Sequence, residues 1–245
     1  MATLDELFEA ITEYPNDMPP RMVYGLQVGG ERGELIALQL DLDEALKNGE
    51  ISGGVVRMNQ LLDDLTKKQA WANPLLPEAK PVEFYRGFVE HVKVDALWFA
   101  ASAERLLRSA PIRHLDVTGL DSPEACDTFF GCGWLGMIHG LALADGFDDR
   151  ALHGLAMSPH LVTLEYLWLP DGSFSDEALA AILDARPGLQ MFSSLEFDEI
   201  YEADWDGSNV FISQPERAVQ FELRYGNRHA LHAKTRNRFA SRMLF

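Results

Sequence analysis

The stretch LGMIHGLAL at residues 135–143 decides the fold, because its spacing of apolar residues occurs twice more in the chain. The pattern is L-x-x-L-x-x-L-x-L, with aliphatic or aromatic side chains at the four marked positions. It returns as LVTLEYLWL at residues 161–169 and as LQMFSSLEF at residues 189–197. The last apolar positions of the three copies are Leu143, Leu169 and Phe197, so the interval between copies is nearly constant.

Weaker copies of the pattern extend the series in both directions. Counting back from Leu143 by the interval between Leu143 and Leu169 reaches Val117, and a slightly shorter step then reaches Val94. Counting forward from Phe197 by the same interval reaches Leu223. Ser122 and Ser175 are expected helix N-caps in the connecting segments. Helical spacing of apolar residues is found between the strand-like stretches, at 97–107, 123–130, 148–157 and 176–185.

Each unit is therefore expected to be a short strand followed by a helix. Such a unit cannot bury its apolar side alone, but stacked units form a parallel strand ladder with outer helices. The period lies within the range of roughly 20 to 29 residues that leucine-rich repeats occupy. The sequence predicts an α/β protein, a short leucine-rich-repeat solenoid of about 5-6 units over residues 77–225. An ordinary doubly wound α/β domain is the alternative, but it predicts no constant period.

The two ends of the chain do not share the repeat. Residues 1–76 are expected to form an N-terminal helical cap, because solenoids need terminal caps with a polar outer face. Apolar residues with helical spacing start at Leu4, and further helices are expected from Pro20 to Gly29, over 35–42 and over 55–71. Residues 226–245 form a basic C-terminal tail.

Three stretches near the N-terminus resemble a bacterial family. PNDMPPRMVY at residues 15–24 and ERGELIALQ at 31–39 are similar to segments of the repeat-companion domain, D-x-x-P-R-L-V-Y-A-D-W-L-E-E and R-G-E-F-I-R-L-Q. FYRGFVE at 84–90 resembles the R-G-F-V-E segment of the same proteins. The chain departs from the family at GLQVGG, residues 25–30, where the family has A-D-W-L-E-E. The resemblance implies that leucine-rich repeats follow the domain and that the protein binds a partner. It implies no particular reaction.

The formal charge of −17 is unevenly distributed over the 245 residues. Residues 1–50 carry eleven acids and three bases and residues 151–200 carry eight and one, whereas 201–245 carry five acids and seven bases. An acidic protein of this kind repels nucleic acid and anionic membranes and attracts a basic partner. The alternative is that the charge only maintains solubility. We expect a cytoplasmic protein, because neither a secretory signal nor a membrane-spanning stretch is visible.

The sequence gives no positive sign of an enzyme, a metal or a cofactor. Cys126 and Cys132 are the only cysteines, and two thiols are favoured over one disulfide in a reducing compartment. No nearby histidine pair has zinc-ligand spacing. His91 and His114 take the same place in adjacent units, where acid-base chemistry beside a carboxylate is conceivable. Neighbours on any strand ladder are close by construction, so we expect no catalytic residue.

Alternation along the strands places the residues that flank the inward leucines on an open face. One column of that face is expected to contain Asp116, Trp168, Glu196 and Glu222, and Tyr166 belongs to the next column. Exposed Tyr and Trp dominate binding hot spots. The alternative is that a neighbouring loop or the C-terminal tail covers both side chains. Residues 196–206 add six acids and three aromatics. The candidate partner-binding residues of this stretch are Glu196, Asp198, Glu199, Tyr201, Glu202, Asp204 and Trp205. The alternative is that the stretch is only a solvated loop.

The sequence therefore predicts a non-enzymatic protein-binding module with a basic protein partner. A more specific form of this prediction is an acidic inhibitor or immunity protein for a basic toxin or nuclease. The alternative is a structural or regulatory scaffold, in which the helical cap binds the partner and the repeats act as a spacer. Neither the partner nor the oligomeric state follows from the sequence.

Overall fold

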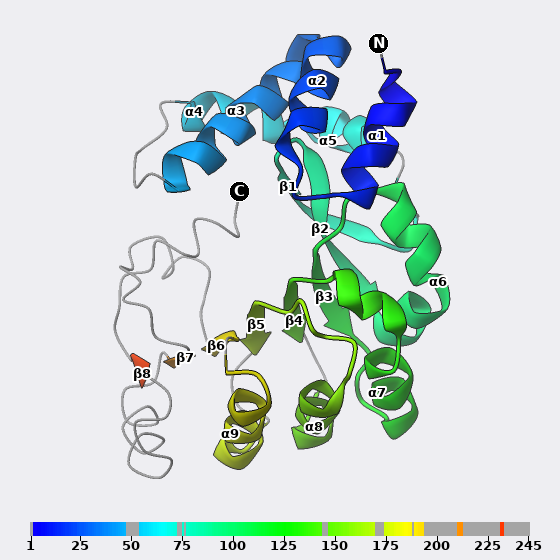
Figure 1. Cartoon of the computed structure of the whole chain (residues 1–245), viewed down its shortest axis with the longest axis vertical. Coiled ribbons are helices and arrows are strands. Elements are labelled where there is room, and N and C mark those ends of the chain that lie inside the picture. The colour runs from blue at the N-terminus through cyan, green and yellow to red at the C-terminus, as the bar shows by residue number, and fades with distance from the viewer. Residues whose placement is uncertain are drawn as a thin grey trace. The chain divides into compact units, whose positions relative to one another are not determined.

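The protein is of mixed α/β class, with helices packed against a mostly parallel sheet (Figure 1). Its contacts divide it into two units: among the described residues, unit 1 contains those up to 92 and 104–113, and unit 2 contains 93–103 and those from 114 to 232. None of the helices in the described part of the chain is long and apolar enough to cross a membrane. The computed structural model describes residues 2–47, 54–72, 75, 77–143, 147–169, 174–187, 189–193, 210–212 and 231–232.

Unit 1 begins with helices, and two of them replace a single expected one. We expected one helix over 55–71, and this was wrong. The carboxylate of Asp64 accepts hydrogen bonds from the backbone N–H groups of Thr66 and Lys67, each at 3.1 Å, so a new helix begins there. The helices are α1 (Leu4–Glu13), α2 (Met18–Val28), α3 (Gly30–Lys47), α4 (Val55–Leu62) and α5 (Leu65–Trp71).

Apolar side chains of these helices form two buried clusters within unit 1. The two clusters take neighbouring residues of α3, so this helix presents apolar side chains in two directions. The first cluster consists of Ile11, Ile36, Leu40 and Phe88. The second consists of Leu35, Leu42, Met58 and Leu61.

A tight hairpin completes unit 1, and its first strand was not among the expected elements. Strands β1 (Lys80–Tyr85) and β2 (Phe88–Asp95) are neighbours in the sheet, joined by Arg86 and Gly87 alone. Both linking residues have positive φ, +48° and +85°, as a type I′ turn requires. The side chain of Gln39 fixes this turn, because its Nε2 donates to the carbonyl oxygen of Phe84 and its Oε1 accepts from the N–H of Gly87, both at 2.7 Å.

Unit 2 alternates strands with helices. Its helices α7, α8 and α9 lie side by side along the same side of the strands (Figure 1). Helix α6 (Ala96–Ser109) contributes residues to both units, as β2 does. The helices are α7 (Pro123–Phe130), the 3-10 helix η1 (Gly133–Met137), α8 (Asp149–Met157) and α9 (Asp176–Ala185). The strands are β3 (His114–Thr118), β4 (Gly140–Leu143), β5 (Tyr166–Leu169), β6 (Gln190–Ser193), β7 (Val210–Ile212) and β8 (Leu231–His232).

The expected N-caps begin two of these helices. The hydroxyl of Ser122 accepts from the N–H of Ala125 at 3.1 Å, and that of Ser175 accepts from the N–H of Ala178 at 3.2 Å. Each hydroxyl satisfies a backbone N–H that lacks a partner within the helix. The helices that follow, α7 and α9, have the bounds that the sequence predicts.

The first three strands of unit 2 are parallel and have the register that the sequence predicts. His114 pairs with Gly140 and Gly140 pairs with Tyr166, so each strand pairs with the next at the interval of the leucine pattern. Along β3 and β5 the aliphatic side chains are buried, whereas the residues between them are half-buried. This alternation shows that one strand face packs against apolar side chains and that the other carries the remaining residues.

The expected register of the next strand was wrong. We expected Glu196 in the column of Trp168, but Trp168 pairs with Phe192, because β6 begins at residue 190. The connection between α8 and β5 covers 158–165, whereas that between α9 and β6 covers only 186–189. The shorter connection moves the strand toward the N-terminus. Strand β7 follows at 210–212, ahead of the strand-like stretch that ends at Leu223, which lies outside the described residues.

Candidate protein-binding site

The predicted aromatic pair lies on β5 of unit 2. The rings of Tyr166 and Trp168 point to the same strand face, with centroids 6.3 Å apart and planes inclined at 53°. Both side chains are half-buried, while Leu167 and Leu169 of the same strand are buried. A strand with parallel neighbours on both sides holds the two rings at a fixed spacing.

Small residues on β4 separate this pair from the polar residues of β3. Register places Gly140 between His114 and Tyr166, and Ala142 between Asp116 and Trp168. A Cβ atom at position 140 would overlap the imidazole of His114, so glycine is needed for that ring to lie over β4. This strand face therefore carries the imidazole of His114 and the carboxylate of Asp116 on β3 and the aromatic rings on β5. Only the small residues of β4 lie between them.

A polar pair lies immediately before strands β4 and β5. The Nδ1 of His139 lies 3.1 Å from Oε1 of Glu165, and Glu165 is half-exposed. The carbonyl oxygen of His139 accepts from the N–H groups of Glu165 and Tyr166, at 2.8 and 3.0 Å. These backbone contacts hold the chain at His139 beside the start of β5.

The other predicted partner-binding residues lie outside the residues that the structure describes. The structure thus places Asp116, Tyr166 and Trp168 of the predicted set on the parallel strands β3 and β5, with β4 between them. The residues outside the described ranges are Glu196, Asp198, Glu199, Tyr201, Glu202, Asp204, Trp205 and Glu222.

Histidine, cysteine and acidic side chains occur in several places in the described part of the chain. No three His, Cys, Asp or Glu side chains are placed there to hold a metal ion. His91 lies 3.7 Å from Oε2 of Glu83 across the hairpin of unit 1. Cys126 and Cys132 are free, and burial raises the pKa of the Cys126 thiol.

A buried ionic network in unit 1 joins two of the stretches that carry the family resemblance, 15–24 and 84–90. Glu90 lies between two guanidinium groups, with Arg21 at 2.8 Å and Arg86 at 2.9 Å. Arg21 also donates to the carbonyl oxygens of Pro15 and Arg86. All of these groups pair with one another inside unit 1. The network therefore explains how the segments are held together. The sequence patterns indicated the segments but not this pairing.

A second buried cation lies beside this network. The guanidinium of Arg32 has the rings of Trp71, Phe84 and Phe88 around it, with its central carbon 5.3 to 5.4 Å from their centroids. Aromatic faces attract a cation in this geometry. Burial lowers the pKa of Arg32 to about 10. Arg32 therefore belongs to the packing of unit 1.

No family model matches this chain, and no curated protein or solved structure shows significant similarity to it. Its function is therefore inferred from its own residues.

Unit 1 also contains a groove that the sequence patterns did not predict. It has a volume of about 540 Å³ and runs between α2 and α3. Its lining is mostly apolar, and Leu26 on its wall is 83% exposed. A leucine exposed to that extent on a helix, beside other exposed apolar side chains, is typical of an interaction surface.

Proposed function

We propose that this chain is a non-enzymatic protein-binding module, built as a leucine-rich-repeat solenoid, whose strand face around Tyr166 and Trp168 contacts a basic protein. The parallel strands, their pairing at the interval of the leucine pattern and the row of helices beside them support the repeat architecture. Stacked repeats of this kind present an extended surface for partners.

The observation that carries this proposal is the aromatic pair on β5. Tyr166 and Trp168 supply large amphipathic side chains, which are the residue types most enriched in binding hot spots. A strand inside a ladder keeps them in place before the partner arrives, so little conformational freedom is lost on binding. Asp116 lies two strands away on β3, and His139 and Glu165 lie immediately before β4 and β5.

The partner's chemistry follows from the charge. A formal charge of −17 accelerates encounter with a basic protein and disfavours nucleic acid. In the specific form of the proposal, the chain is an acidic inhibitor or immunity protein for a basic toxin or nuclease. Such an inhibitor would mask a basic surface that the enzyme uses to hold its own anionic substrate.

Partner capture from the native lysate tests the proposal. Purified full chain is immobilised, and retained proteins are eluted by increasing salt and identified. The proposal predicts a basic protein that salt releases, because exposed charge pairs are screened. The double variant Tyr166→Ala, Trp168→Ala should lose that protein while keeping the circular dichroism spectrum of the parent. A retained toxin or nuclease should lose its activity when the purified chain is added.

Trp134→Ala is the matched control for the aromatic pair. Trp134 is exposed and lies in η1 of the same unit, so its removal should leave capture unchanged. Unchanged capture by the double variant would overturn the strand face as the binding surface. Capture of acidic or salt-insensitive proteins alone would overturn the basic partner.

The alternative function is a scaffold in which the helices of unit 1 bind the partner. The groove between α2 and α3 favours it. A partner that the Tyr166→Ala, Trp168→Ala variant retains, and that Leu26→Asp releases, would select this alternative.

A further inference from the structure

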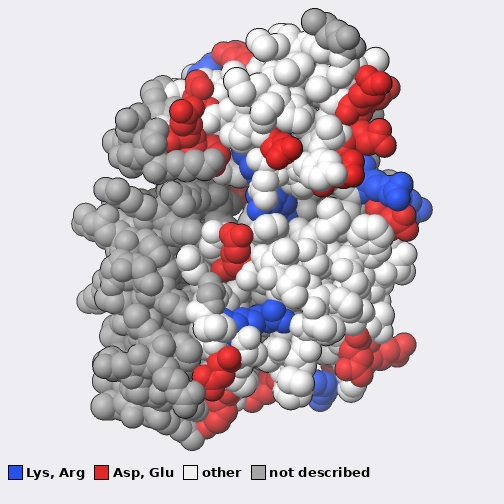
Figure 2. Space-filling view, viewed as in Figure 1, with Lys and Arg blue, Asp and Glu red and all other residues white. Residues whose placement is uncertain are grey.

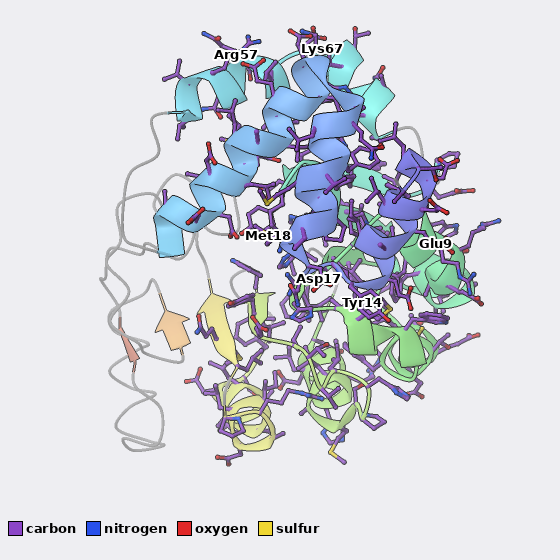
Figure 3. All side chains as sticks on the ribbon, turned by 45° about the horizontal axis from the view of Figure 1, so that its top comes forward. Glu9, Tyr14, Asp17, Met18, Arg57 and Lys67 are labelled. Atoms are coloured by element: carbon purple, nitrogen blue, oxygen red, sulfur yellow. The ribbon has the colours of Figure 1, made fainter. Side chains whose placement is uncertain are left out.

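The groove of unit 1 lies along a helical hairpin. Helices α2 and α3 run side by side in Figure 3, with Met18 at the start of α2 and with Arg57 and Lys67 beyond the opposite end. The hairpin turns at Gly29 and Gly30, whose φ angles of +60° and +54° suit glycine. The groove therefore extends along both helices from this turn toward Met18.

Glycine residues make the floor of the groove low. The two helices touch where Gly25 meets Gly33, and a Cβ atom at position 33 would overlap the carbonyl oxygen of Gly25. Gly29 continues the same line toward the turn. No side chain rises from these positions, so a third element can approach the backbone of both helices closely.

The length of the groove suits a helix. It is lined by α3 from Gly30 to Glu44, which spans roughly 21 Å at a rise of 1.5 Å per residue. A helix of about four turns covers that length. Amphipathic helices that bind in apolar grooves use this number of turns to place anchors at positions i, i+3 or i+4, and i+7.

The wall on α2 is apolar and adaptable. Met18, Met22 and Leu26 lie on one face of this helix, at spacings of four residues, and all three line the groove. Met22 is 56% exposed and Leu26 is 83% exposed. Methionine side chains adjust to the shape of a bound apolar surface. This wall therefore fits the apolar face of a partner helix.

The opposite rim on α3 is acidic. Glu34, Asp41 and Glu44 line it, and none of the described residues that line the groove is Lys or Arg. Arg57 neutralises Glu34 through two hydrogen bonds of 2.9 and 2.7 Å. In the part of the chain that the structure describes, Asp41 and Glu44 form no ion pair, and both are exposed. Figure 2 shows a largely uncharged surface in the region of α2, with acidic side chains on either side, including the side where α1 lies.

We infer that the groove between α2 and α3 binds an amphipathic helix of a partner protein, whose apolar face lies against Met18, Met22 and Leu26 and whose Lys or Arg residues contact Asp41 and Glu44. Charge complementarity fixes the partner's class, because an acidic helix would meet like charges along the rim. The inference does not depend on the strand face of unit 2, since it uses residues of α2 and α3 alone.

A synthetic peptide tests the inference directly. The probe is a fluorescently labelled helical peptide of about four turns, with Leu along one face and Lys along one flank. Its binding to the full chain is measured by fluorescence anisotropy at low and moderate salt. We expect saturable binding that weakens with salt, and no binding of the same peptide with Glu in place of Lys.

Variants of the groove separate its two contributions. Asp41→Lys with Glu44→Lys should weaken the Lys peptide about tenfold and allow the Glu peptide to bind, because two rim attractions become repulsions. Leu26→Asp should weaken the Lys peptide about tenfold or more by placing a charge on the apolar wall. Glu9→Lys with Asp127→Lys is the matched control, since both residues are exposed and the change in net charge is the same.

Several results would overturn the inference. These are equal binding of the Lys and Glu peptides, or binding that Asp41→Lys with Glu44→Lys leaves unchanged. A dimer of the full chain that Leu26→Asp dissociates would make a second copy the occupant. Tighter peptide binding after Arg236→Glu with Arg238→Glu would make the basic C-terminal segment of the same chain the occupant. The Tyr166→Ala, Trp168→Ala variant should bind the peptide like the parent, so failure of the proposed strand face is distinguishable from failure here.

Discussion

The guanidinium group of Arg21 lies 2.8 Å from the carboxylate of Glu90, and neither side chain has any exposed surface. Arg21 belongs to α2 and Glu90 to β2, so this ion pair ties the helices of unit 1 to its hairpin. Burial lowers the pKa of Arg21 to about 10, although Glu90 acts in the opposite direction. Arg86 reaches the same carboxylate at 2.9 Å, so one anion serves two buried cations.

Glu90→Gln is expected to lower the free energy of unfolding by about 3 to 5 kcal/mol, because it leaves two buried guanidinium groups without an anion. Urea denaturation of the full chain measures the change. Glu104→Gln is the matched control: Glu104 pairs with Arg108 at a similar 2.9 Å, but both are exposed, and the variant should behave like the parent. Equal effects of the two variants would contradict the role given to Glu90.

Tyr85→Phe is expected to change the dependence of stability on pH. The hydroxyl of Tyr85 donates to the carboxylate of Asp43, and burial together with this carboxylate raises the pKa of Tyr85 above its ordinary value of 10.0. The unfolded chain therefore loses this proton at lower pH than the folded chain. The stability that Tyr85 contributes is complete below pH 10 and is lost as the pH rises through the folded pKa.

The measurement for Tyr85 compares the parent and the variant by urea denaturation at a series of pH values. The difference in their free energies of unfolding should shrink above pH 10, and the tyrosinate absorbance of the variant should lack an ionising step above pH 10. A difference that stays constant or grows above pH 10 would show that the hydroxyl keeps no raised pKa.

Gly33→Ala is expected to lower the free energy of unfolding by about 1 to 3 kcal/mol, because the added methyl overlaps the backbone of Gly25 and forces α2 and α3 apart. Thermal and urea unfolding measure this effect. Gly133→Ala is the control, since its added methyl would lie 3.9 Å from the imidazole of His160, an ordinary contact. A Gly33→Ala variant as stable as the control would show that the two helices are not in backbone contact.

Arg186→Ala is expected to loosen the segment that follows α8. The Arg186 guanidinium donates to the carbonyl oxygen of Leu155 near the end of α8 and to those of Ser158 and Leu161 in the segment that follows it. Loss of these contacts should cost about 1 to 3 kcal/mol and accelerate amide exchange in this segment. Arg186→Lys keeps the charge but not the fork of donors, so it should recover only part of the stability. Full recovery would mean that charge alone matters.

Much of unit 2 could be predicted because its signals are local. The spacing of leucines at 135–143 and 161–169 sets the register of β3, β4 and β5. Ser122 and Ser175 set the starts of α7 and α9 through contacts three residues away. The position of β6 could not be predicted in this way, because the leucine pattern at 189–197 fits the period while the shorter connection after α9 places the strand earlier.

The two candidate binding surfaces also differ in how far the sequence alone predicts them. Tyr166 and Trp168 share a strand face because side chains alternate along a strand, which the sequence alone determines. The groove beside Leu26 depends on the approach of α2 to α3 at Gly25 and Gly33, which nothing in the spacing of apolar residues reveals. Arg21 and Glu90 likewise meet only in three dimensions.

The sequence by itself determined the α/β class, the helices with capped starts and the register of β3, β4 and β5, because each depends on short local patterns of residues. Only the tertiary structure decided the hairpin turn at Arg86, the buried ion pair of Arg21 with Glu90 and the groove between α2 and α3. The ion pair joins residues distant in the chain, whereas the turn and the groove form between consecutive elements. The energies of all three come from burial and close contact that local patterns do not encode.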